Sequence, residues 1–287
     1  MKKKIFMTFI VSLLLFNLVA CGVTASNPNN PNNTETVKPS VPENENPPQP
    51  DAGNPNPPTT PDKPSDPEIP STPLDKYTTY VKSVTANLSV RASASFNGSV
   101  VGKMDKGDLL YLESKQNDWY KVKYKNGYAY VSASESYTQL YIIKQNEKNI
   151  ESVLQVGYSL LGTEYVYGAV RYHDGRGNLL YNFSKKYFDC SSLTQYMFYI
   201  GAGVLMDTTS RSQSLQGKFV NASNIQRGDV MFFTNSTRFD NTGIERIGHV
   251  GVFLGNNYIL HTSSDFAVIE EINTTRWNYL ISVKRFV

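Results

Sequence analysis

Among the side chains of this sequence, one cysteine stands out as suited to nucleophilic chemistry. Cys190 directly follows Asp189, and apolar residues recur after it at helical spacing, at Leu193, Tyr196, Met197 and Ile200. This pattern predicts that Cys190 starts a helix, with Asp189 or Ser191 as its cap. The N–H groups and the dipole at that end of a helix stabilise a thiolate, which is the nucleophilic form of cysteine. Cys190 is therefore the candidate nucleophile, and it needs a histidine nearby to take up its proton.

Two of the three histidines are spaced as such partners. His249 precedes the apolar run 250–254, His261 follows the apolar run 258–260, and Gly255-Asn256-Asn257 between them is a turn. A hairpin centred on residue 255 places the two histidines directly across from each other, and a shift of one or two residues separates them slightly. Opposed in this way, one imidazole can face the sulfur while the other orients it, which is the logic of a catalytic triad.

The N-terminal residues are organised as an export signal. Lys2, Lys3 and Lys4 form a positive head, and an apolar run continues to Val19, just before Cys21. The end of this segment, Leu18-Val19-Ala20-Cys21-Gly22, resembles the lipobox of bacterial lipoproteins. The resemblance implies cleavage after residue 20 and a diacylglycerol on the Cys21 sulfur; the alternative is an ordinary signal peptide with an incidental cysteine. We expect a protein anchored by lipid on the outer face of the bacterial cell membrane, facing the wall.

This expectation leaves Cys190 without a partner. The chain has 2 cysteines, and exported proteins normally pair them as disulfides. If one is lipidated, the other is an unpaired thiol in an oxidising compartment, which favours a chemical role for Cys190 over that of an inert buried residue.

Composition divides the chain at about residue 75. All 15 prolines lie between Pro28 and Pro73, in a segment with almost no apolar side chains, so residues 21–75 are expected to be a disordered linker. The remainder carries 23 basic and 17 acidic residues. This surplus is mild and no basic run has interleaved aromatics, so nucleic acid is not an expected partner.

Residues 77–140 follow the alternating pattern of short strands. Asn126-Gly127 is expected to form a hairpin turn between two of them. The segments Asn87-Leu88-Ser89-Val90-Arg91 and Asp118-Trp119-Tyr120-Lys121-Val122 resemble a bacterial SH3 domain, which implies a small all-β barrel that binds cell-wall peptides. Ala129-Tyr130 replaces the family's Gly-Trp, and a spacer without a ligand is the alternative.

Cys190, the two histidines and the residues around them resemble the NlpC/P60 family of peptidoglycan peptidases. The matching segments are 162–169, 189–191, 209–213, 228–233 and 248–251, in a consistent order within residues 147–287. The resemblance implies an α+β, papain-like fold, in which a helix bearing the cysteine packs on an antiparallel sheet bearing the histidines. It also implies a cysteine peptidase that hydrolyses stem-peptide amide bonds, typically between D-glutamate and the following diamino acid.

The same resemblance assigns roles to individual residues. It implies that Cys190 is the nucleophile, His249 the base and His261 the residue that orients it, and that Tyr165 helps to hold the oxyanion. Asp189, Ser191 and Ser210 correspond to residues that line the substrate side; the alternative for Asp189 is a helix cap only. No metal or other cofactor is expected, because the histidines lack further carboxylate or thiolate ligands at suitable spacing.

The chain departs from the family pattern in its longest loop. Tyr165 and Cys190 are about a dozen residues further apart than usual, and the extra residues, around 171–184, are expected to form a loop beside the substrate groove. Two alternatives stay open: another thiol amidase or acyltransferase on the same fold, and a wall-binding lipoprotein without activity. We expect a monomer whose partners are peptidoglycan stem peptides and, through the lipid, the membrane.

Overall fold

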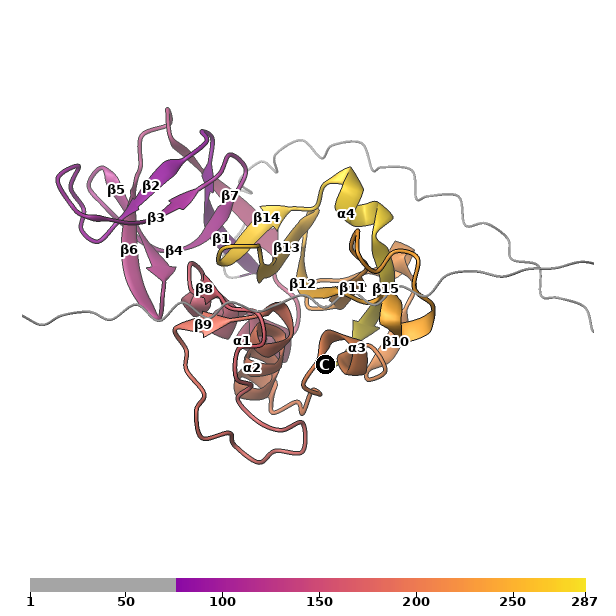
Figure 1. Ribbon diagram of the computed structural model, residues 1–287. Coiled ribbons are helices and arrows are strands. Elements are labelled where there is room, and N and C mark those ends of the chain that lie inside the picture. The colour runs from indigo at the N-terminus through magenta and orange to yellow at the C-terminus, as the bar shows by residue number, and fades with distance from the viewer. Residues whose placement is uncertain (1–75) are drawn as a thin grey trace, which may run out of the picture. The chain divides into compact units, whose positions relative to one another are not determined.

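The computed structural model describes residues 76–287 (Figure 1). The predicted signal peptide (1–20), the predicted lipidation site Cys21 and the predicted linker (21–75) lie outside the described residues. Within residues 76–287, no helix is both long enough and apolar enough to cross a membrane.

The first part of the described chain is a β domain of seven antiparallel strands. The strands are β1 (Tyr77–Ser83), β2 (Leu88–Arg91), β3 (Val100–Met104), β4 (Leu109–Gln116), β5 (Trp119–Tyr124), β6 (Gly127–Ser132) and β7 (Thr138–Lys144). They form one sheet in the order β3-β2-β6-β5-β4-β1-β7. The last strand runs four residues beyond the predicted end at residue 140.

The predicted hairpin turn lies one residue earlier than expected. Tyr124 pairs with Gly127, so Lys125 and Asn126 occupy the two central positions of the turn. Both have positive φ, 48° and 60°, as a two-residue hairpin turn of type I′ requires. The sequence had suggested that Gly127 is part of the turn. It is instead the first residue of β6.

The second part of the described chain mixes helices with a second antiparallel sheet. Its helices are α1 (Lys148–Leu160), α2 (Cys190–Ala202), α3 (Ser210–Gln213), α4 (Thr274–Asn278) and the 3-10 turns η2 (Ala222–Asn224) and η3 (Gly243–Arg246). Its strands are β8 (Glu164–Tyr165), β9 (Tyr187–Phe188), β10 (Lys218–Val220), β11 (Val230–Phe233), β12 (His249–Gly255), β13 (Tyr258–Thr262), β14 (Ala267–Glu271) and β15 (Leu280–Arg285). Strands β10–β15 form one sheet in the order β10-β15-β11-β12-β13-β14.

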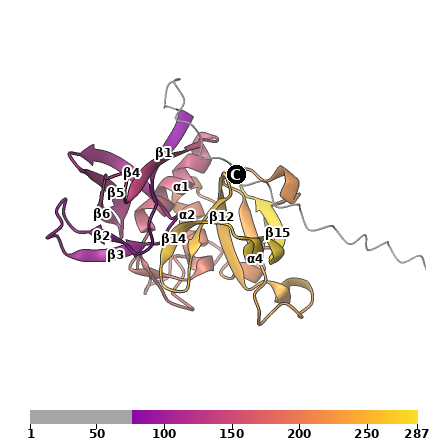
Figure 2. The ribbon, with the colours of Figure 1, turned by 90° about the horizontal axis from the view of Figure 1, so that it is seen from above.

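Helices α1 and α2 pack together against this sheet (Figures 1 and 2). They approach closely because Gly201 of α2 has no side chain: a Cβ there would lie 2.4 Å from the Val153 Cα. The large core combines α1 and α2 with alternate strand residues such as Val250 and Val252. The opposite strand residues, such as Phe233 and Ile259, form a smaller cluster against which Trp277 of α4 packs. The predicted α+β fold, with the cysteine helix packed on an antiparallel sheet, is confirmed.

A buried polar cluster joins the β domain to the second part. Arg227, whose side chain is 5 % exposed, forms an ion pair with Glu151 of α1 at 2.7 Å. It also donates hydrogen bonds to the hydroxyls of Tyr80 in β1 (3.1 Å) and Tyr158 in α1 (2.8 Å). Moving the two parts apart would leave the buried Arg227 charge without some of its partners, which is costly. These contacts therefore stabilise the association of the two parts.

The β5–β6 turn makes a second connection. The backbone N–H groups of Lys125 and Asn126 donate to the carbonyls of Leu161 and Ser159 at the end of α1, at 2.8 and 2.6 Å. Helix ends leave such carbonyls without partners within the helix. The turn therefore completes the end of α1, only a few residues before Tyr165.

Candidate active site

The first turn of α2 holds Cys190 in a fixed position. Asp189 is the N-cap: its side chain accepts a hydrogen bond from the Ser192 N–H at 2.8 Å, and the Ser192 hydroxyl accepts one from the Asp189 N–H at 2.9 Å. This capping box satisfies backbone groups that would otherwise lack partners. The sequence prediction that the helix starts at Cys190 is confirmed, and of the two candidate caps, Asp189 and Ser191, the cap is Asp189.

The Cys190 thiol is protonated in this environment. Burial raises its pKa to about 12, and the Asp189 carboxylate adds to the rise. Hydrogen bonds from the backbone of Val250 and Ser191, and the Arg171 charge, act in the opposite direction but are weaker. The helix end was expected to favour a thiolate; burial beside a carboxylate outweighs that effect.

The two histidines meet on adjacent strands, diagonally rather than directly across. Val252 pairs with Leu260, so the hairpin is centred one residue later than predicted and His261 lies beside Gly251. A Cβ on Gly251 would come within 2.8 Å of the His261 Cβ, so the glycine leaves the room that His261 needs. His249 Nε2 then lies 2.9 Å from His261 Nδ1, with the two rings perpendicular.

Both imidazoles are neutral at rest. Burial lowers the pKa of His249 well below its ordinary value, and His261 and Arg276 lower it further. Burial also lowers the pKa of His261. Among residues 76–287 no hydrogen bond joins the Cys190 sulfur to either imidazole, although the backbone of Val250, the residue after His249, reaches that sulfur. These surroundings therefore favour a neutral thiol and neutral imidazoles over an ion pair.

Tyr165 lies near the cysteine. Strand β8 pairs in parallel with β9, which sets Tyr165 opposite Phe188, two residues before Cys190. Burial raises the pKa of Tyr165, and the charges that Cys190 and Asp189 can carry raise it further. The phenol thus keeps its proton and can donate a hydrogen bond near the sulfur.

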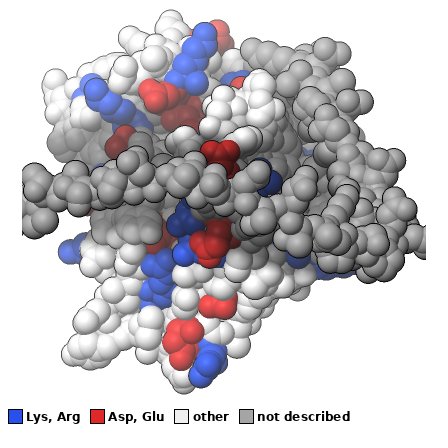
Figure 3. Space-filling view, turned by 45° about the vertical axis from the view of Figure 1, so that its right-hand side comes forward, with Lys and Arg blue, Asp and Glu red and all other residues white. Residues whose placement is uncertain are grey.

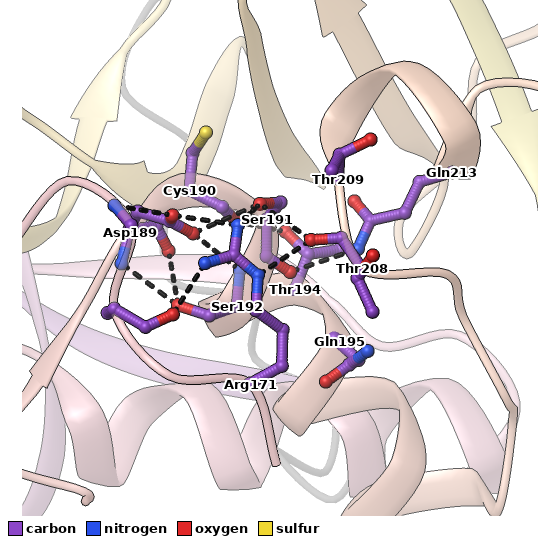
Figure 4. A network of polar contacts seen from close by, with 12 residues as sticks. Arg171, Asp189, Cys190, Ser191, Ser192, Thr194, Gln195, Thr208, Thr209 and Gln213 are labelled. Atoms are coloured by element: carbon purple, nitrogen blue, oxygen red, sulfur yellow. Dashed lines mark hydrogen bonds and ion pairs between the residues drawn. The ribbon is translucent and has the colours of Figure 1, made fainter. Parts of the chain in front are cut away.

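Asp189 and Ser191 are occupied by contacts within the protein (Figure 4). The Ser191 hydroxyl donates to Asp189 at 3.0 Å, and Arg171 Nη2 lies 2.8 Å from the other Asp189 oxygen and 2.7 Å from the Ser191 hydroxyl. Arg171 Nε donates to the Thr208 carbonyl at 2.6 Å. In Figure 4 the Cys190 sulfur points away from this network. These two polar side chains therefore hold the helix start in place.

Ser210 lies apart from this network. It is the first residue of α3, whose cap is Thr209, and in the part of the chain that the structure describes its hydroxyl has no hydrogen-bond partner. The buried Gln213, three residues later, donates from Nε2 to the carbonyls of Ser191 (3.0 Å) and Asp207 (2.8 Å). Gln213 thus pins the cysteine helix, a role that the sequence did not reveal.

The extra loop around 171–184 is held at both ends. Arg171 fixes its start, and near its end Phe183 stacks on Tyr196 of α2 with ring centroids 5.1 Å apart. Between them the Tyr181 side chain is fully exposed. The contacts of Arg171 with the start of α2 were also not predicted from the sequence. The one signal for them was the basic character of this residue at the start of the extra loop.

Comparison with known proteins identifies both parts of the chain. Residues 162–285 match the NlpC/P60 family, and residues 86–137 match the bacterial SH3 domain. These matches agree with both resemblances seen in the sequence.

The chain is also similar to several peptidases. It is 30 % identical over 148 residues to peptidoglycan DL-endopeptidase CwlO of Bacillus licheniformis, which covers 50 % of this chain and 29 % of the relative. It is 27 % identical over 180 residues to gamma-D-glutamyl-L-lysine dipeptidyl-peptidase of Bacillus subtilis, covering 62 % and 53 %. It is 34 % identical over 95 residues to murein DD-endopeptidase MepS/murein LD-carboxypeptidase of Escherichia coli strain K12, covering 33 % and 46 %. The chain thus spans about half or less of each relative.

Proposed function

We propose that this protein is a cysteine peptidase that hydrolyses amide bonds in the stem peptides of peptidoglycan. The observation that carries the proposal is that the Tyr165 phenol and strand β12 both approach Cys190. Strand β12 begins with His249, whose imidazole is hydrogen-bonded to His261 of β13. The names of two relatives, peptidoglycan DL-endopeptidase and murein DD-endopeptidase, support the substrate. The name of the third specifies gamma-D-glutamyl-L-lysine, and we propose cleavage between D-glutamate and the diamino acid that follows it.

The neutral resting site fits general-base catalysis. His249 accepts the thiol proton as the Cys190 sulfur attacks the scissile carbonyl carbon, and catalytic hydrogen bonds of this kind commonly tighten only when substrate is bound. The oxyanion that forms accepts hydrogen bonds from the Tyr165 hydroxyl and the Cys190 N–H. His249 then returns the proton to the leaving amine, which leaves a thioester. Water hydrolyses the thioester to a carboxylate and restores the thiol.

Digestion of purified peptidoglycan tests the proposal. Mass spectrometry of the soluble products is expected to find a new carboxylate on D-glutamate and a new amine on the diamino acid. New ends at another bond would place the specificity elsewhere. Transfer of the acyl group to an added amine in place of water would indicate an acyltransferase, and intact peptidoglycan would indicate a wall-binding protein without activity.

We further propose that Cys21 carries a lipid that anchors the protein to the outer face of the cell membrane, facing the wall. The lipobox-like segment before Cys21 supports this, and the proposed active site lies far along the chain, beyond residue 160. Cys21→Ser is expected to release the protein from the membrane fraction with its peptidase activity intact. A variant that stays in the membrane fraction would contradict lipid anchoring at this residue.

On the face seen in Figure 3, basic and acidic side chains are interspersed, and neither sign forms a continuous patch over the part that is not covered by grey atoms. A surface of this kind provides no long-range attraction for a strongly anionic polymer. Recognition of the wall is thus proposed to rest on local contacts with the stem peptide.

A further inference from the structure

The hydrogen-bonded histidines continue into two further side chains. His261 Nε2 lies 3.0 Å from Glu270 Oε1, and the same oxygen lies 2.7 Å from Arg276 Nη2. Together with the 2.9 Å contact between His249 and His261, this makes an unbroken line of four side chains from β12, β13, β14 and α4. Neither Glu270 nor Arg276 was expected from the sequence to belong to the site.

Strand register explains why Glu270 reaches His261. Val268 pairs with His261 and Glu270 pairs with Ile259, so Glu270 is the diagonal neighbour of His261 on the same face of the sheet. Diagonal neighbours are within reach of long side chains. His249 stands in the same diagonal relation to His261 on the other side, with Gly251 leaving the space between. The adjacent Glu271 is exposed and takes no part in the line.

We propose that Glu270 is a positioning residue that fixes which nitrogen of each histidine carries a proton, and so makes His249 Nδ1 the basic atom. This inference rests on the proposed function for its catalytic meaning, but its structural content does not. His261 Nε2 lies 3.0 Å from a Glu270 oxygen, and because a carboxylate only accepts hydrogen bonds, this contact favours a proton on Nε2 over a lone pair there.

The remaining protons follow in sequence. Because His261 is neutral and protonated on Nε2, its Nδ1 is a bare acceptor. His249 Nε2 must then donate to that atom, which leaves the lone pair on His249 Nδ1 free to accept the thiol proton. Without Glu270, His261 can hold its proton on Nδ1 instead and donate it to His249 Nε2. His249 then carries its own proton on Nδ1, where it has no lone pair for the thiol proton.

The charge state of Glu270 agrees with this role. Burial raises its pKa, but the contact with His261 and the positive charge of Arg276 outweigh burial, so that the net shift is downward. Glu270 is therefore ionised at neutral pH, and Arg276 holds its acceptor oxygen in place. A carboxylate that orients a histidine from behind is a recurrent device around reactive imidazoles.

Nitrogen-15 NMR of the histidine side chains of the whole protein tests the proton arrangement directly. In the wild type, His249 and His261 are both expected to carry their proton on Nε2, and in Glu270→Ala the two forms should be mixed. A wild-type His249 protonated on Nδ1 would overturn the proposal. This readout does not depend on turnover, so it separates failure of this inference from failure of the proposed peptidase function.

Kinetics provide the second readout. Glu270→Ala is expected to lower kcat by about 10- to 100-fold with little change in KM, as for other residues that orient a catalytic group. Glu270→Gln should recover much of the loss, because Arg276 can hold the amide oxygen toward His261. Glu271→Ala is the matched control and should behave as the wild type. Equal kcat for Glu270→Ala and Glu271→Ala, with both folded, would contradict the proposal.

Discussion

The two sides of the proposed active site are built in different ways. On the cysteine side, the start of α2 is held by contacts from irregular segments: Arg171 from the extra loop, the carbonyl of Thr208, and Gln213. On the histidine side, His249, His261 and Glu270 come from three neighbouring strands, and register alone brings them together. The cysteine side therefore depends on loop closure, whereas the histidine side depends on strand pairing.

This difference predicts how each side fails. A change in the loop contacts should loosen the cysteine helix and lower stability, because buried charges and backbone groups lose their partners. A substitution of His249, His261 or Glu270 should leave the sheet intact, because the strands keep their backbone hydrogen bonds. It should act mainly on the rate of reaction.

The largest effect is expected at the base. His249→Ala should remove nearly all turnover while the free energy of unfolding changes little, since the ring lies at the start of β12 and the strand keeps its backbone hydrogen bonds. Peptidoglycan digestion and urea denaturation check the two halves of this prediction. Turnover close to the wild-type rate would show that another group takes the thiol proton.

On the cysteine side, Arg171→Ala is expected to cost about 3 kcal/mol of stability, because it leaves the buried Asp189 carboxylate without its cation. Activity should fall with it as the start of α2 loosens. Arg176→Ala, in the exposed part of the same loop, is the matched control and should change neither. Urea denaturation of both variants decides the matter, and equal midpoints would mean that the Arg171 contacts do not hold the helix.

A smaller effect is expected for His261→Gln. The amide oxygen of glutamine can still accept the His249 N–H, so part of the activity should remain, in contrast to His249→Ala. Steady-state rates of the two variants on the same stem peptide make the comparison. An equal loss in both would show that the roles of the two histidines are wrongly divided.

The smallest effect is a shift in pH dependence. The neutral form of His249 is the active one, and burial, followed by the neighbouring His261 and Arg276, lowers its pKa below the ordinary value of about 6.5. Activity should therefore be kept as the pH falls through 6.5 and be lost only below it. A profile of kcat/KM against pH measures this, and an acid limb above pH 6.5 would contradict a His249 pKa that is lowered by burial.

The contrast between the two sides also separates what the sequence could and could not predict. The helix at Cys190 and its Asp189 cap follow from local spacing and local chemistry, so they were predictable. The histidine hairpin was predictable except for its register, because Asn256 and Asn257 both adopt positive φ and move the turn centre by one residue.

Residues whose role depends on distant partners were missed. Arg171 reaches Asp189 only because the extra loop closes onto α2, and Arg227 meets Tyr80 across 147 positions of the chain. Glu270 left one weak signal, as the first of two adjacent carboxylates that end a strand beginning with three apolar residues. Its meaning depends on the pairing of β13 with β14, which periodicity alone does not determine.

The central claim is that the Cys190 sulfur is the nucleophile, and Cys190→Ala tests it most directly. The sulfur is small, so its loss should cost little stability, while the chemistry loses its attacking atom. Wild type and variant are incubated with the same purified peptidoglycan, and the new carboxylate and amine ends are quantified by mass spectrometry. The account predicts new ends with the wild type and none with the folded variant; new ends at a rate near that of the wild type would contradict it.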